Sequence, residues 1–196
     1  MTPKQADRLR KKITDIRRVL AAEKRKFGWH DDSRGLRYFP TKYHIQLGDV
    51  VGGLTYTRWF AKNFPDDAGF PEFLFEWLVI LFKNGKIKEA EQKAIETFCA
   101  DIHLLNSFLG RPPAVSELWE DEPRTDSISA EYFGSLSTQV SLTDYAEWLT
   151  EFVATDRFLS STGKYIDLRR QLQGEHDLVQ RRHLVAQLGA IAHPTG

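Results

Sequence analysis

The chain has 196 residues, of which 41% are hydrophobic and 28% charged. This balance excludes a disordered chain, and the length suffices to bury a core. The single cysteine, Cys99, excludes an internal disulfide framework.

Charge is unevenly distributed along the chain, although the net charge is zero. Residues 1–26 carry ten Lys or Arg against three acids, a net charge of +7. Residues 113–156 carry ten acids against one Arg, a net charge of −9. The asymmetry indicates either two segments that neutralise each other or a basic surface for an anionic partner.

No segment resembles a signal peptide or a membrane span. The first residues are polar and charged, without the apolar core of a signal sequence. The most apolar stretch, 73–82, contains Glu76 and has about half of the roughly 20 residues that a spanning helix needs. We therefore expect a cytoplasmic protein that makes no membrane contact.

The first predicted helix begins at Pro3 after a Thr2 N-cap, continues to about Lys26 and ends before Gly28. Its apolar residues recur every three or four positions, which predicts one buried stripe: Ala6, Leu9, Ile13, Ile16 and Leu20. This stripe should pack on the rest of the protein and leave the basic side near the acidic segment or in solvent.

Four further helices are predicted before residue 110. The second begins near Ser33 and ends at Leu47, with a kink or break at Pro40. The remaining three are expected at 50–63, 71–83 and 86–108. Capping residues and glycines set these limits.

The C-terminal part predicts a Pro-rich acidic connection followed by shorter helices. These helices are expected at about 129–137, 143–154, 164–173 and 177–188. Because no sustained period-two alternation is found, the fold class is all-α. The predicted division is a basic N-terminal helix (1–27), helical hairpins (28–110), the acidic connection (111–128) and a C-terminal helical capping region (129–196).

An internal repeat relates the segments that follow Leu47 and Asn84. In both, a glycine (Gly48, Gly85) ends one helix and a small residue (Gly53, Ala90) follows five positions later. The glycines are 37 residues apart, close to the roughly 34-residue period of tetratricopeptide repeats. The glycine would form the turn of a helical hairpin, and the small residue would let its two helices approach closely.

The chain resembles the tetratricopeptide repeat family over roughly residues 28–110. It is most similar to bacterial members that open their hairpins with an Asp-x-x-Gly-x-Arg-Tyr helix, here Asp32-Ser33-Arg34-Gly35-Leu36-Arg37-Tyr38. Asn63-Phe64-Pro65-Asp66-Asp67 and Asn84-Gly85-Lys86-Ile87-Lys88-Glu89-Ala90-Glu91 continue the likeness. About two hairpins are visible, so helices at both ends would have to cap a right-handed stack of antiparallel hairpins.

The resemblance implies a protein-interaction scaffold or adaptor that needs no cofactor and performs no chemistry. Its partner would be a protein or peptide of unknown identity, and a homodimer is possible. The first helix of each hairpin should line the concave face, which makes the candidate partner-binding residues Arg34, Arg37, Lys42, Glu72, Glu76 and Lys83. Arg37 is also expected to pair with a carboxylate, from Asp32, Asp67 or Glu76.

Two alternative functions remain open. The basic helix 1–26 could contact nucleic acid, in which case binding should be weak and fall steeply with salt. Arg170 and His176 resemble an Arg-to-His pair of some helical ribonucleases, but Gly174 between them should break the helix.

Other possible sites have simpler structural interpretations. Cys99 and His103 lie four residues apart on a predicted helix and could hold a metal, but no further ligand is near in sequence, so no metal is expected. The stretch 161–164 has the spacing of a Ser-x-x-Lys nucleophile without the other elements of that chemistry, and is predicted to be a turn and helix start. We predict no catalytic residues.

Overall fold

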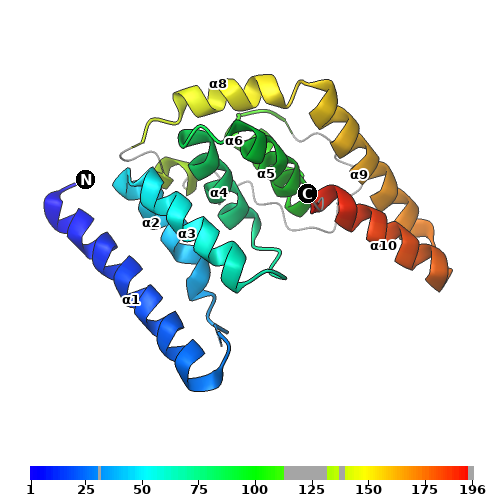
Figure 1. Ribbon diagram of the computed structural model, residues 1–196. Helices are drawn as coiled ribbons and strands as arrows, with labels where there is room; N and C mark the ends of the chain where they lie inside the picture. Colours follow the sequence, from blue (N-terminus) through cyan, green and yellow to red (C-terminus); the bar gives the residue numbers. More distant parts are fainter. Residues whose placement is uncertain (31, 113–131, 137–139, 194–196) are drawn as a thin grey trace. The chain divides into compact units, whose positions relative to one another are not determined.

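Every regular element of the computed structural model is helical within the residues that the structure describes, which are 1–30, 32–112, 132–136 and 140–193 (Figure 1). The predicted all-α class is therefore confirmed for this part of the chain. Most of the predicted acidic connection, from residue 113 on, lies outside the described residues.

The chain forms two compact units. Unit 1 comprises residues 1–86 and 132–142, and unit 2 comprises residues 87–131 and 143–196. The predicted hairpin segment, 28–110, is thus divided between the two units after Lys86.

Helix α1 (Pro3–Phe27) opens unit 1 and has the predicted start. Thr2 and Gln5 form a capping box, in which the Thr2 hydroxyl accepts from the Gln5 amide and the Gln5 side chain accepts from the Thr2 amide. Helix α1 packs on α2, and of the five predicted stripe residues Ile13 and Leu20 are buried while Ala6, Leu9 and Ile16 are partly buried.

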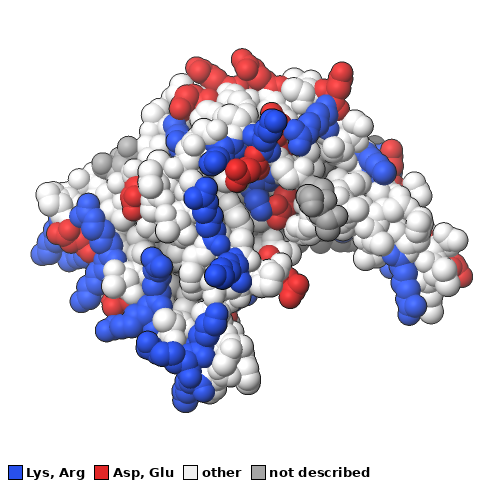
Figure 2. Space-filling model, viewed as in Figure 1, with Lys and Arg blue, Asp and Glu red and all other residues white. Residues whose placement is uncertain are grey.

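The basic residues of α1 are solvent-exposed, although Lys24 also donates to Asn63 on α3. Figure 2 shows Lys and Arg side chains gathered over this helix, and all ten are exposed. The described acids of the predicted acidic segment, Asp144, Glu147, Glu151 and Asp156, belong to unit 2.

The second predicted helix is shorter than expected. Gly35 adopts a left-handed conformation with φ 64°, a 3₁₀ turn (η1, Leu36–Tyr38) follows, and α2 begins only at Phe39 and ends at Leu47. Pro40 lies in the first turn of α2, where no intrahelical amide bond is needed. The predicted break near Pro40 is therefore present as the change from the 3₁₀ turn to α2, and the predicted α-helix before it is replaced by that turn.

Helices α3 (Val50–Asn63) and α4 (Pro71–Lys83) have the predicted bounds. In unit 1, α2, α3 and α4 all contact one another. The same turn ends α2 and α4: Gly48 and Gly85 have φ 70° and 69°. The next amide donates to the carbonyl five residues back, Asp49 to His44 and Lys86 to Leu81. The two predicted repeat glycines thus have the same role, which is to end a helix in a left-handed turn.

Gly53 lies where α3 crosses its neighbours. A Cβ atom there would lie 2.9 Å from Ile80 Cδ1 on α4 and 3.4 Å from His44 Cβ on α2. Ala90, its counterpart in the repeat, is fully buried in unit 2. The prediction that both small residues are buried is confirmed.

We expect Gly53→Leu to lower the free energy of unfolding by about 1–3 kcal/mol or more, because the added side chain overpacks this crossing. Val51→Leu on the same helix is the matched control, since Val51 is 68% exposed and should tolerate the change. Urea denaturation of both variants measures the difference. Equal stability of the two variants would contradict the close approach of the helices.

Unit 2 contains the remaining helices: α5 (Ile87–Ala100), α6 (Leu104–Phe108), α8 (Thr143–Phe152), α9 (Asp156–Gly174) and α10 (Leu178–Ala192). Helices α5, α9 and α10 contact one another. The unit has an aromatic core in which the Phe158 ring on α9 lies edge-on to Phe98 and Phe152.

Two predicted elements of unit 2 were wrong. The helix expected to continue to Phe108 stops at Ala100, because the Asp101 carboxylate accepts the amides of His103 and Leu104 and starts α6. The helix expected to start at 164 begins at Asp156, where the Thr155 hydroxyl caps it.

Candidate binding groove

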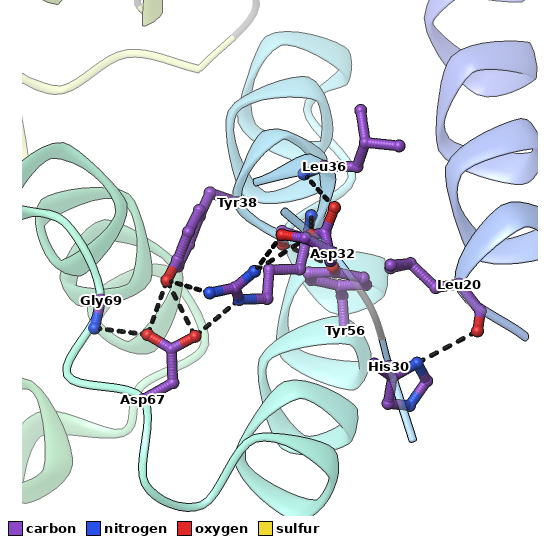
Figure 3. A network of polar contacts seen from close by, with 9 residues as sticks. Leu20, His30, Asp32, Leu36, Tyr38, Tyr56, Asp67 and Gly69 are labelled. Carbon is purple, nitrogen blue, oxygen red and sulfur yellow. Dashed lines mark hydrogen bonds and ion pairs between the residues drawn. The ribbon is translucent and has the colours of Figure 1, made fainter. Parts of the chain in front are cut away.

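A polar network fixes the chain just before α2 (Figure 3). The Asp32 side chain, 1% exposed, accepts the amide protons of Leu36 and Arg37 at 2.8 and 2.7 Å. The Tyr56 hydroxyl on α3 donates to the Arg37 carbonyl at 2.6 Å. These bonds hold the 3₁₀ turn in place because each one satisfies a backbone group at its start or within it.

The Arg37 guanidinium joins this turn to the loop between α3 and α4. Its Nε donates to Asp67 Oδ2 at 2.6 Å and its Nη1 to the Asp32 carbonyl at 2.9 Å. The Tyr38 hydroxyl lies 2.6 Å from Asp67 Oδ1, and the Gly69 amide donates to the same oxygen. Arg37 thereby bridges two carboxylates 35 residues apart.

The network also shifts the titration of its members. Burial alone would raise the pKa of the Asp67 carboxyl, but hydrogen bonds from Tyr38 and Arg37 outweigh it and hold that pKa below its ordinary value. Burial, together with the bond to Asp67, raises the pKa of Tyr38 to about 12. Asp67 is therefore a carboxylate and Tyr38 a neutral phenol at physiological pH.

Arg37 has the predicted structural role, with Asp32 and Asp67 as its partners. Glu76, the third predicted partner, does not join this network. The two motifs that carry the family resemblance, one around Asp32 and the other around Asp67, are thus joined by the bonds of Arg37 to both carboxylates.

A groove opens beside this network, between the start of α2 and the start of α4. Its cavity has a volume of about 350 Å³. Tyr38 forms part of its wall, so the Arg37 network also holds a groove residue in position. The walls are aromatic, with both charge signs at the rim: Arg34, Gly35, Tyr38, Phe39, Lys42, Phe70, Glu72, Phe73, Glu76 and Tyr132.

Glu76 is the buried acid of the groove. Its Oε2 lies 2.5 Å from the Thr41 hydroxyl, and its Oε1 lies 2.6 Å from the Tyr132 hydroxyl. The Thr41 hydroxyl also lies 3.0 Å from the Tyr38 carbonyl and has only one proton to donate. A protonated Glu76 that donates to Thr41 satisfies all three groups at once.

Burial favours the same neutral form of Glu76. It raises the pKa of this carboxyl to about 7 and outweighs the Thr41 and Tyr132 hydroxyls and the nearby Lys42 charge, which favour the ionised form. The Glu72 carboxylate acts in the same direction as burial. The floor of the groove therefore carries a carboxyl that holds its proton up to near-neutral pH.

One side chain in the groove comes from a distant part of the chain. Tyr132 belongs to a helical stretch, 132–136, which is part of unit 1 although residues 87–131 belong to unit 2. The Lys42 ammonium lies 4.8 Å from the centre of the Tyr132 ring. The groove thus already holds a short polypeptide segment of the protein itself.

Four of the six predicted partner-binding residues line this groove: Arg34, Lys42, Glu72 and Glu76. Arg37 lies behind it in the polar network. Lys83 lies at the other end of α4, with its ammonium 5.8 Å from the Phe82 ring centre. The structure therefore brings four of the six together at one site.

Sequence reasoning missed most of the aromatic walls and the resident Tyr132. The adjacent aromatics Tyr132 and Phe133, placed among small polar residues, are the one local signal that could have drawn attention to this segment. Nothing in the sequence relates them to Glu76, which lies 56 residues away.

The structure does not bring the predicted alternative metal or catalytic residues into a site. Cys99 lies on α5 but His103 is the N-cap of α6, so the two do not share a helix as predicted. The stretch 161–164 lies inside α9 instead of forming a turn. Arg170 pairs with Asp167 on α9 at 3.3 Å, while His176 is exposed in the link that follows Gly174.

No family model matches this chain, and neither does any curated protein or solved structure. Among the described residues, no three or more His, Cys, Asp or Glu side chains are grouped so that they could hold a metal ion. No described helix is long and apolar enough to cross a membrane.

Proposed function

We propose that unit 1 is a tetratricopeptide-like module that binds a polypeptide segment of a partner protein in the groove between α2 and α4. The observation that carries this proposal is Tyr132, a side chain from a distant segment that already occupies the groove through a hydrogen bond and a cation–π contact.

The packing of the helices supports the repeat-like part of the proposal. The third helix of a hairpin stack contacts both helices of the preceding hairpin, and α4 contacts both α2 and α3 (Figure 1). The equivalent glycine turns after α2 and α4 are the feature that these two helices share with the first helices of repeat hairpins. The groove lies between them, where the resemblance places the binding face.

The composition of the groove also suits a polypeptide. Phe39 and Phe70 at the rim are 46% and 58% exposed, which is unusual for phenylalanine and provides apolar area for a ligand. Arg34 and Glu72 offer charged hydrogen-bonding groups of both signs beside them. An apolar surface with a few polar groups is the usual form of a peptide-binding groove.

A photo-cross-linking residue in place of Phe70 should give discrete protein adducts in native lysate, because this position faces the groove. The same residue in place of Val51, 68% exposed on α3, is the matched control and should give few. Adducts are identified by mass spectrometry of the cross-linked peptides. An identical adduct pattern at the two positions would refute a binding groove.

A second function, binding of nucleic acid by α1, is favoured by one observation. All ten basic residues of this helix are exposed, and Figure 2 shows Lys and Arg side chains gathered over it. Such a surface attracts phosphates without reading a base sequence.

We expect this binding to be weak and to fall steeply as salt rises. Lys4→Glu with Arg8→Glu should reduce the affinity for a fluorescent single-stranded oligonucleotide and flatten its salt dependence. Arg58→Glu with Lys62→Glu on α3 makes the same change of charge away from α1 and is the control. Tight binding that survives physiological salt would favour nucleic acid over the scaffold function.

A further inference from the structure

The stretch 132–136 packs on the groove helices by more than one side chain. Tyr132 contacts Glu76, and the Phe133 ring centre lies 5.1 Å from that of Phe75 on α4. From α2, the Gln46 amide donates to the Ser135 carbonyl at 3.0 Å. The stretch is thus bound to both groove helices, with one main-chain contact and two aromatic side chains.

Leu136 gives the stretch an apolar anchor, since it is fully buried. A short helix that presents apolar anchors and one hydroxyl to a groove is a known way in which proteins recognise peptides. The contacts made by 132–136 are therefore those that a separate bound peptide would make.

The groove is not filled by this stretch. The cavity of about 350 Å³ remains open next to Tyr132, with Phe39 and Phe70 exposed at its rim. A ligand that replaced Tyr132 could make the same contacts with Glu76 and Lys42 and gain further contacts with the two phenylalanines. An external segment can therefore contact more groove surface than the resident one does.

We infer that residues 132–136 are an internal ligand of the groove, and that the external partner is a polypeptide segment that presents a tyrosine in place of Tyr132. This inference rests on the proposed peptide-binding function. The Tyr132 hydroxyl donates a hydrogen bond to Glu76 Oε1, with 2.6 Å between the two oxygens, and the Lys42 ammonium lies over the ring. A phenol therefore satisfies both groups. Phenylalanine would leave the carboxyl oxygen without its donor.

Because the resident segment belongs to the same chain, it competes at a high effective concentration. Only the fraction of molecules with a vacant groove can bind the partner, and the apparent affinity falls by that fraction. A substitution that weakens the contacts of Tyr132 with the groove should therefore increase the affinity for an external segment. This is the opposite of what loss of a partner-contact residue would do.

The test uses the full chain and a fluorescent peptide with the sequence of residues 132–142, Tyr-Phe-Gly-Ser-Leu-Ser-Thr-Gln-Val-Ser-Leu. We expect Tyr132→Ala to bind this peptide about tenfold more tightly than the unaltered chain, and Tyr132→Phe to show a smaller gain in the same direction. A second peptide with Phe in place of its Tyr should bind Tyr132→Ala several-fold more weakly. Tyr165→Phe, which removes a phenol of α9 in unit 2, is the control and should leave both affinities unchanged.

Three results of the peptide titrations would each overturn the inference: equal affinity of the unaltered chain and both Tyr132 variants, equal binding of the two peptides, or no binding to any variant. Circular dichroism verifies that the variants are folded, and Tyr132→Phe keeps the ring if Tyr132→Ala unfolds. A dimer in size-exclusion chromatography that is lost in Tyr132→Ala would make a second copy the occupant, and would also overturn it. If the peptide test failed but cross-linked adducts still formed at position 70, the proposed binding function of the groove would stand. Only the inference that the partner presents a tyrosine would be refuted.

Discussion

Replacing Arg37 with methionine is expected to lower the free energy of unfolding by about 3–5 kcal/mol. The methionine keeps most of the apolar stem of the side chain but removes the guanidinium. The carboxylates that remain, Asp32 and Asp67, have side chains that are only 1% and 14% exposed. A buried charge that loses its partner keeps its full desolvation cost, so the loss far exceeds that of a surface pair.

Equilibrium denaturation with guanidinium chloride measures this difference. The free energy of unfolding of Arg37→Lys should lie between those of Arg37→Met and the unaltered protein. An ammonium keeps the positive charge but lacks the several donors with which the guanidinium reaches Asp67, Asp32 and Tyr38 together. Arg10→Met is the matched control, since Arg10 pairs with Asp7 on the exposed side of α1 and should be replaceable without measurable loss. If Arg37→Met and Arg10→Met were equally stable, the network would not be what holds the 3₁₀ turn and the α3–α4 loop together.

The second large effect is expected at Glu76 and depends on pH. The pKa of this buried carboxyl is raised from its ordinary value, 4.5, to about 7. Between these two values the unfolded chain releases the proton while the folded protein keeps it. The stability contributed by Glu76 is therefore fully present below pH 4.5 and is lost as the pH rises through about 7.

Glu76→Gln should remove this loss, because glutamine is neutral at every pH and has nearly the same shape. Its amide can donate to Thr41 while its oxygen accepts from Tyr132, as the protonated acid does. The free energies of unfolding of the variant and the unaltered protein should be equal near pH 4.5. Near pH 8 that of the variant should be larger by roughly 3 kcal/mol.

Thermal or urea unfolding of both proteins across this pH range provides the measurement. Val51→Leu is the control, since this exposed change on α3 alters no titrating group and should leave the pH dependence of the unaltered protein unchanged. A stability difference between Glu76→Gln and the unaltered protein that is the same at all pH values would contradict a protonated Glu76.

The elements that the sequence predicted correctly are those whose ends carry strong local signals. Helix α3 begins after Asp49, whose side chain accepts the Gly52 amide, and α4 begins at Pro71. The glycines after α2 and α4 adopt the left-handed conformation that their repeat position predicts. Such signals act within about four residues, so they can be read without knowledge of the fold.

The predictions failed where a local signal was ambiguous. The Asp101 cap divides a helix that its apolar periodicity predicts to be continuous. Gly163 resembles a turn residue, yet it lies inside α9 because the Thr155 cap starts that helix eight residues earlier. In both cases a single capping side chain decided the boundary.

The sequence by itself determined the helical class, the glycine turns after α2 and α4, and four residues that line one groove. It could not determine that Arg37 is engaged by Asp67, or that Tyr132 lies against Glu76. These contacts join residues 30 and 56 positions apart, and they exist only because helix packing brings distant side chains together. Burial, which raises the pKa of Glu76 and excludes water from Asp32, is likewise a property of the packed molecule and not of any short stretch of sequence.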